Sequence, residues 1–281
     1  MTKKPKGWYK AVTIRPTVSV EGYASYEKMC SQIADVYFSM TEESLEKRLK
    51  INSHESINIT AYTLFQVGKA KCPAYWVGEE LLAALMKSDL NVEVENLKWA
   101  MKTGFFMLPN NRVMSPENRS VNAIFWHCDT TNDYLYWAAM DGASFFCRRA
   151  KISEHLKQLR YTDVQDINPQ VVEEFNEYLQ SIFLRLILIM ECRTELVDTE
   201  SQVIRINKGF SKEQAQDFYE PLWVGKNYRF KREDTQDIGG THASPRVHWR
   251  RGFLRNQPYG QGRQQRKIVW IEPVLVMGKQ S

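Results

Sequence analysis

Apolar positions in the first hundred residues recur with the spacing of an α-helix. Within 23–49 they fall three or four residues apart, which places them on one helical face. The hydroxyl of Thr41, followed by two glutamates, is typical of the start of a second helix. Segments 58–70 and 76–90 have the composition of two more helices. The pattern therefore predicts a mainly helical region over residues 1–100.

From Gly104 onward the pattern changes to short runs of β-branched and aromatic residues. Clusters of turn residues separate the runs, and segment 129–133 has the composition of a hairpin loop because Asp and Asn tolerate a left-handed backbone. The runs predict an antiparallel sheet whose strands lie within 104–108, 121–127, 134–139 and 144–147.

A long apolar helix is predicted over 169–197, because Asn168 and Pro169 form a helix-start signal and the apolar residues behind them share one face. This helix is expected to pack on the sheet. The last apolar run, 267–276, predicts a terminal strand.

These elements together predict an α+β fold. A helical N-terminal region over 1–100 precedes residues 101–281, which hold an antiparallel sheet packed by the long helix and a C-terminal basic β-hairpin joined to that sheet. The basic motif spans 239–276. The two regions are expected either as separate units or as one continuous domain.

Aromatic residues in the predicted sheet occur in adjacent pairs, so one ring of each pair is expected on each face of the sheet. Either the helix at 169–197 or a partner peptide must cover the outward rings. Trp126 and Trp137 are the candidates for peptide binding.

Composition places the chain among folded proteins, since 43% of its 281 residues are hydrophobic and 12% are aromatic. The net charge of +5 is unevenly distributed. Residues 226–281 contain 12 basic and 4 acidic residues, and residues 1–15 add five basic residues and no acid. The body between them is therefore net acidic, and anionic partners are expected at the basic ends.

The basic C-terminal segment has the composition of an anion-binding surface. Residues 241–270 include seven Lys and Arg and no carboxylate. Guanidinium groups suit phosphates, and interleaved aromatic rings suit bases. The candidates for binding RNA or another anionic partner are Arg246, His248, Trp249, Arg250, Arg251, Arg255 and Tyr259. Alternatively, these residues form a solvated hairpin face whose arginines pair with the acidic body.

Two histidines in this segment allow a second interpretation. His248 and His242 could act as base and acid, with Arg246 or Arg250 stabilising the phosphorane, in a metal-independent endoribonuclease. His248 could equally orient the turn that follows it, and no catalytic residue is assigned. The protein is therefore not expected to be an enzyme, and if it is one, a ribonuclease is expected.

No metal or cofactor is expected. A zinc site at His127, Cys128 and Cys147 is disfavoured because adjacent strand residues point to opposite faces. A magnesium site would need acids that fall mostly in predicted loops, where acids are ordinary: Glu117, Asp129, Asp133 and Asp141.

The five cysteines are an odd number without a Cys-x-x-Cys pair, which favours reduced thiols. Residues 182–190 form the longest apolar run, which is too short for a membrane span and contains Arg185. These features predict a cytosolic protein with no membrane partner.

The C-terminal motif resembles that of a family of phage and plasmid proteins that includes a type V-A anti-CRISPR protein. The resemblance is strong over about 35 residues and weaker over about 150. The matching positions are His248, Arg250, Arg251, Gly252, Trp270, Pro273 and Val276. Phe253 stands where the family usually has a histidine, and Leu254 replaces an aromatic residue.

The resemblance implies a mobile-element protein that recognises a host CRISPR or other defence protein as a nascent N-terminal peptide and lowers its production through translation-dependent loss of its mRNA. In this hypothesis the sheet aromatics bind the peptide and the basic tail engages RNA or the ribosome. Phe253 favours a positioning role over chemistry, because an apolar ring cannot replace a catalytic histidine. The alternatives are the endoribonuclease and a non-catalytic peptide- or RNA-binding module.

Overall fold

The structure is a computed structural model of the chain. It describes residues 47, 56–70, 74–93, 99, 101–141, 145–155, 158–161, 172–199, 203–205, 217–219, 222–234 and 247–277. The helices predicted within 23–49 lie outside the described residues.

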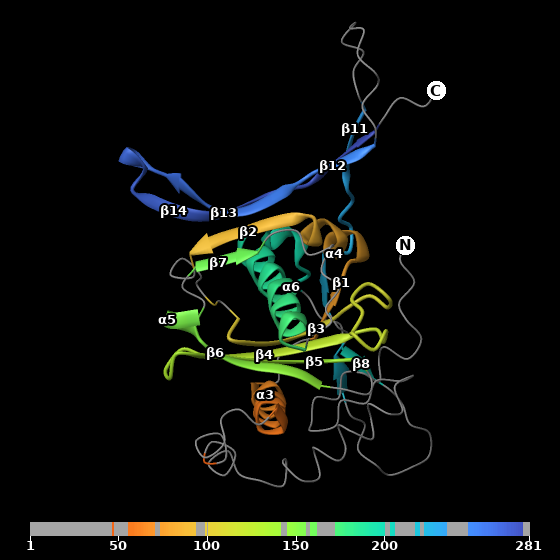
Figure 1. Cartoon of the computed structure of the whole chain (residues 1–281), viewed down its shortest axis with the longest axis vertical. Helices are drawn as coiled ribbons and strands as arrows, with labels where there is room; N and C mark the ends of the chain where they lie inside the picture. The colour runs from red at the N-terminus through yellow and green to blue at the C-terminus, as the bar shows by residue number, and fades with distance from the viewer. Residues whose placement is uncertain are drawn as a thin grey trace, which may run out of the picture.

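A six-stranded mixed sheet forms the centre of the molecule (Figure 1). Its strand order is β10 (Leu222–Val224), β1 (Ala74–Val77), β3 (Thr103–Met107), β4 (Ala123–Asp129), β5 (Tyr134–Met140) and β6 (Phe145–Lys151). Strands β3 to β6 are antiparallel, as predicted, but β1 runs parallel to both β3 and β10. The α+β class is confirmed, whereas a wholly antiparallel sheet is wrong because β1 and β10 come from distant segments.

The helix predicted over 76–90 is wrong at both ends. Residues 74–77 form β1, a shorter helix α4 (Glu79–Met86) follows, and residues 88–93 form β2. The helix predicted over 58–70 is confirmed as α3 (Ser56–Ala70).

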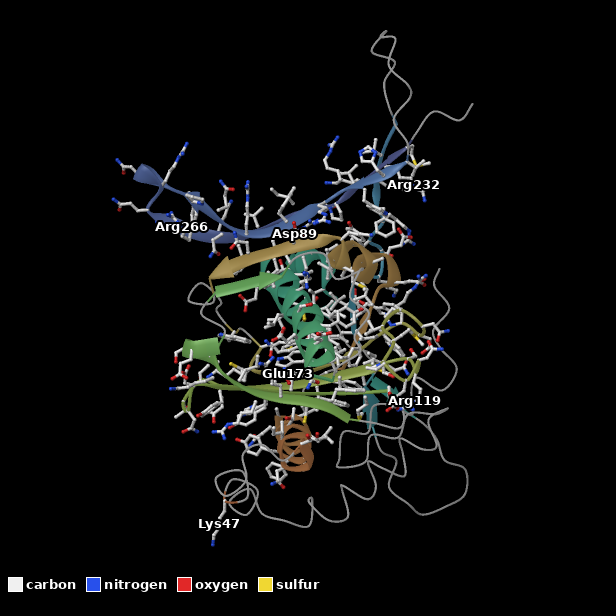
Figure 2. The ribbon with its side chains drawn as sticks, viewed as in Figure 1. Lys47, Asp89, Arg119, Glu173, Arg232 and Arg266 are labelled. Carbon is white, nitrogen blue, oxygen red and sulfur yellow. The ribbon has the colours of Figure 1, made fainter. Side chains whose placement is uncertain are left out.

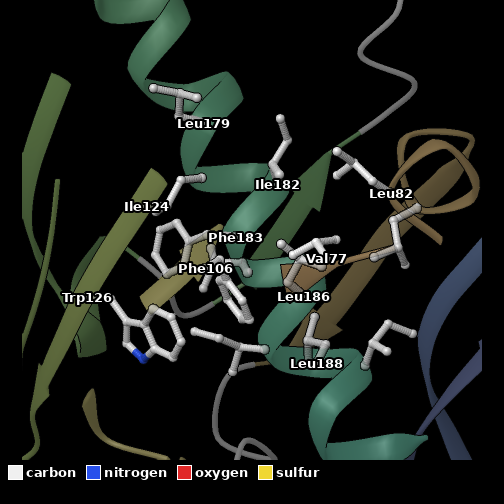
Figure 3. Packing of buried hydrophobic residues seen from close by; sticks show 14 of the residues in the cluster. Val77, Leu82, Phe106, Ile124, Trp126, Leu179, Ile182, Phe183, Leu186 and Leu188 are labelled. Atoms are coloured by element: carbon white, nitrogen blue, oxygen red, sulfur yellow. The ribbon is translucent and has the colours of Figure 1, made fainter. Parts of the chain in front are cut away.

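Helices cover both faces of the six-stranded sheet (Figure 1). On one face, α3 places Tyr62 4.9 Å from Tyr136, measured between ring centroids. On the other face, α6 (Val172–Cys192) places Phe183 5.8 Å from Trp137. Figure 3 shows the core that α6 shares with the sheet, including Phe106, Ile124 and Leu186. Both aromatic faces of the sheet are therefore internal.

A second sheet lies on the far side of α6, so this helix is enclosed between two sheets (Figure 1). Its order is β14 (Gln265–Ile271), β13 (Gly252–Tyr259), β2 (Ser88–Glu93) and β7 (Gln158–Tyr161). Leu254 and Trp270 project from it into the same core as the α6 residues. The strands β13 and β14 thus provide an outer layer of the molecule.

One long hairpin contains most of the basic C-terminal segment. β12 (His248–Arg250) pairs with β15 (Val274–Met277), and β13 pairs with β14. Arg250 pairs with Val274 and Phe253 pairs with Ile271, so the pairing continues from β12 and β15 into β13 and β14 without a shift in register. We call residues 248–277 the C-terminal hairpin.

Pro273, which lacks an N–H group, separates β14 from β15, so the strand predicted over 267–276 is divided in two. The hairpin pairs with β2 and with β11 (Lys231–Asp234). It does not pair with a strand of the six-stranded sheet, so the predicted connection to that sheet is wrong.

The remaining elements are short. They are α5 (Ile152–His155), the 3-10 turns Thr194–Leu196 and Gln261–Arg263, and the pair β8 (Val203–Arg205) and β9 (Asp217–Tyr219). None of the described helices is long and apolar enough to cross a membrane.

Candidate anion-binding surface

Ser88 is the buried point at which the C-terminal hairpin is attached to the body. Its hydroxyl donates to the carbonyl of Ala84 at 2.9 Å and accepts from Trp270 Nε1 at 3.0 Å. Its carbonyl accepts from Nε of the buried Arg185 at 3.1 Å. Because Ser88 is fully buried, these bonds link α4, α6 and β14 without competition from water.

Gly252 allows the hairpin to approach this point closely. A Cβ atom at this position would lie 2.4 Å from Ser88 Oγ and 2.7 Å from both the Ile271 carbonyl oxygen and Pro273 Cδ. All three distances are below ordinary van der Waals contact. The glycine that follows the two arginines is therefore required by packing against β2.

Glu272 contributes the only carboxylate of the C-terminal hairpin, and it is neutralised internally. Arg193 Nη1 lies 2.7 Å from its Oε1, and Lys231 Nζ lies 3.6 Å away. The Arg193 guanidinium also lies 5.5 Å from the ring of Trp270. Burial, followed by the charge of Glu272, raises the pKa of Tyr228, so its hydroxyl stays protonated beside the carboxylate.

Cations on the hairpin outnumber the acids that reach them. Arg251 lies 3.8 Å from the half-buried Asp89 of β2, and a pair at the surface of this kind contributes little. Within the described part of the chain, Arg255, Arg263 and Lys267 have no carboxylate within ion-pair distance. Figure 2 shows Arg266 and Arg232 at opposite ends of this layer, with Asp89 between them. The surface is therefore positively charged along its length.

Five of the predicted binding residues are exposed on this surface: His248, Arg250, Arg251, Arg255 and Tyr259. Trp249 is half-buried because its ring packs edge-on against Phe230, with the centroids 4.9 Å apart. Arg246 lies outside the described residues.

Arg263, Arg266 and Lys267 extend the surface, although the sequence did not single them out as binding residues. The sequence feature that could have identified them is the segment 241–270, which contains no carboxylate. Their positions on β14 and in its turn could be assigned only once the register was known.

The structure brings together only part of the proposed ribonuclease site. His248 is exposed on β12, where it pairs with Val276, and Arg250 lies two residues further along the strand. His242 and Arg246 fall outside the described residues. Catalysis by these groups stays a prediction.

Trp126 and Trp137 are not accessible to a peptide, which corrects their assignment as a peptide-binding pair. Both side chains are 0% exposed. Trp137 Nε1 donates to Gln180 Oε1 of α6 at 3.2 Å, and Trp126 stacks on Phe106 at 4.5 Å. Since α6 covers this face, the two rings are core residues.

The considered metal ligands have other roles. His127 Nδ1 lies 2.9 Å from Thr103 Oγ1, and burial raises the pKa of Cys128 to about 12. Asp129 accepts the N–H groups of its own loop, and Asp141 pairs with Arg119. Among the residues that the structure describes, no three His, Cys, Asp or Glu side chains are placed to hold a metal ion.

A comparison with models of known protein families gives a match. The model of the anti-CRISPR type V subtype A2 family matches residues 75–278, from β1 to just past β15. No curated protein and no solved structure matches the chain. Because the match spans both sheets, α6 and the C-terminal hairpin, it covers well over half of the sequence. The chain therefore belongs to the anti-CRISPR type V subtype A2 family.

Proposed function

We propose that this protein is a mobile-element anti-CRISPR protein that recognises a host CRISPR protein as a nascent N-terminal peptide and lowers its production through its mRNA. The family match over residues 75–278 carries the proposal. The protein acts in the bacterial cytoplasm, where the nascent chain and its message are together on the ribosome.

The C-terminal hairpin engages RNA, either the message or the ribosome. Support comes from its cations, since a polyanion is the partner that uncompensated Arg and Lys side chains attract. The hairpin is held firmly by Ser88, Gly252 and Glu272. Its charges are therefore presented on a rigid layer, which lowers the ordering cost of binding.

A reporter assay tests this role. The reporter carries the N-terminal coding sequence of the host CRISPR nuclease, and message and protein are both measured with and without the anti-CRISPR protein. The double variant Arg250→Ala and Arg251→Ala is expected to abolish silencing while changing the free energy of unfolding by less than about 0.5 kcal/mol, because both side chains are exposed.

The matched control removes the same charge elsewhere. Lys47→Ala with Lys102→Ala changes two exposed cations outside the hairpin and should silence normally. Undiminished silencing by the arginine variant would exclude the RNA-engaging role. A reporter without a start codon separates translation-dependent loss from direct attack on the message.

The endoribonuclease alternative rests on the exposure of His248 beside Arg250. It predicts that purified protein cleaves RNA in the presence of a chelator and that His248→Ala abolishes this cleavage. Intact RNA after prolonged incubation with the wild-type protein would exclude it.

A further inference from the structure

The alternation of side chains along β13 and β14 creates one outward face. Phe253 pairs with Ile271, and Arg255 pairs with Val269. In an antiparallel sheet, two residues that pair across the strands have their side chains on the same face, and so has every second residue along each strand. The remaining members of this face are Gln257, Tyr259, Lys267 and Gln265.

The opposite face is internal at Leu254 and Trp270, which belong to the core that contains the α6 side chains. Phe253, Tyr259 and Ile271 instead have exposed fractions of 43%, 42% and 40%. Only four large hydrophobic residues are this exposed among the described side chains, and three of them gather on this face. Such clustering marks an interaction surface.

Cations lie between the exposed rings. Arg255 follows Phe253 at the next position on the same face, and Lys267 Nζ lies 5.5 Å from the ring of Tyr259. Neither cation has a carboxylate partner in the described residues. Asp89, beside Phe253 in the neighbouring strand, is within reach of Arg251 instead.

We propose that this face binds single-stranded RNA, with bases stacked on Phe253 and Tyr259 and phosphates held by Arg255 and Lys267. A single strand alternates an aromatic group with an anion, which matches the alternation of ring and cation on the face. Bases in a duplex are already stacked on one another, so rings of this kind select unpaired bases. Phe253 and Tyr259 are about 20 Å apart along the strand, which leaves room for several nucleotides.

This inference rests on the RNA contact in the proposed function and specifies its ligand and its face. It also distinguishes Trp249 from Phe253 and Tyr259, because the Trp249 ring packs against Phe230 and is not proposed to stack on a base. An acidic peptide would satisfy the cations but would provide no stacking partner for the two exposed rings.

Fluorescence anisotropy with the purified full chain tests the proposal. The probes are a labelled 15-nucleotide single-stranded RNA of mixed sequence, the matching RNA duplex and a poly-glutamate peptide. The wild-type protein is expected to bind the single strand most tightly. Tyr259→Leu and Phe253→Leu should each weaken binding between about fivefold and 150-fold, whereas Tyr259→Phe should retain it.

The salt dependence distinguishes the rings from the cations. Arg255→Ala and Lys267→Ala should each reduce the slope of log affinity against log salt by about 0.7, whereas Tyr259→Leu should leave the slope unchanged. Lys102→Ala removes an exposed cation directly before β3 of the six-stranded sheet and should change neither affinity nor slope. Circular dichroism verifies the fold of each variant.

Absence of binding to the single strand, tighter binding to the duplex or the peptide, or unchanged affinity in the ring and cation variants would each overturn the proposal. The reporter assay is independent of this measurement. Silencing without RNA binding would reject the inference alone, and RNA binding without silencing would reject the proposed function alone.

Discussion

Replacing Gly252 by alanine tests whether the C-terminal hairpin depends on close contact with the body. The new methyl group would lie 2.4 Å from Ser88 Oγ, closer than side-chain carbons normally approach an oxygen. The hydroxyl cannot turn away at no cost, because it bonds to both the Ala84 carbonyl and Trp270 Nε1. Breaking these two buried hydrogen bonds costs about 1 to 3 kcal/mol, and overpacking a core typically costs a similar amount.

The replacement also has a stabilising effect, so the sign of the change in the free energy of unfolding is informative. Replacing glycine by alanine stabilises a protein by about 0.4 to 1 kcal/mol where the residue fits, because it restricts the unfolded chain. An open site at Gly252 would therefore give a more stable variant. We expect a net loss of about 1 to 5 kcal/mol in the free energy of unfolding, measured by urea denaturation followed by tryptophan fluorescence.

The double variant Gly252→Ala with Ser88→Ala locates the clash. Removing Oγ eliminates the nearest contact. The double variant should therefore lose less free energy of unfolding than the two single variants lose in sum. Relief should be partial, since the Ile271 carbonyl and Pro273 remain at 2.7 Å. A neutral or stabilised Gly252→Ala variant, or strictly additive costs, would refute the packing argument.

Three further variants test the roles assigned to buried residues. Trp270→Phe should cost about 1 to 3 kcal/mol in urea denaturation, because it leaves the Ser88 hydroxyl without its donor. Trp137→Ala should cost about 3 to 5 kcal/mol, as for a core residue, whereas a surface peptide binder would lose little. Burial raises the pKa of Cys128 from 9.0 to about 12, so the unfolded chain loses this proton first and stability falls as the pH rises between these values. Cys128→Ala should remove up to about 1.4 kcal/mol per pH unit from that slope.

Elements whose pattern is local were predictable from the sequence. The strands β3 to β6 coincide with runs of β-branched and aromatic residues, and the helix α3 follows the composition of its segment. The loop between β4 and β5 is capped by Asp129, as its composition indicates. Strand β1 was not predictable, because its parallel partners lie on β3 and β10. The burial of Ser88 was not predictable either, because the residue is polar and its burial depends on hydrogen bonds to distant groups.

The candidate surface was predictable as a basic segment but not as a face. Sequence could not show which charges are paired, because Asp89, the partner of Arg251, and Arg193, the partner of Glu272, come from distant segments. The sequence also could not show which elements cover the aromatic rings on the two faces of the six-stranded sheet. One ring of each pair was expected on each face, with the outward rings covered by the helix at 169–197 or by a partner peptide. In the structure α6 covers one face and α3 the other, so Trp126 and Trp137 are internal.

The tail motif combines two kinds of residue that a binding experiment must distinguish. Gly252 and Trp270 hold the hairpin against Ser88, whereas His248, Arg250 and Arg251 are exposed. Loss of silencing in a Trp270 variant would therefore reflect a displaced hairpin, and it should appear together with a lower free energy of unfolding. Loss of silencing at unchanged stability can come only from the exposed group. The stability measurement thus decides which half of the motif carries recognition.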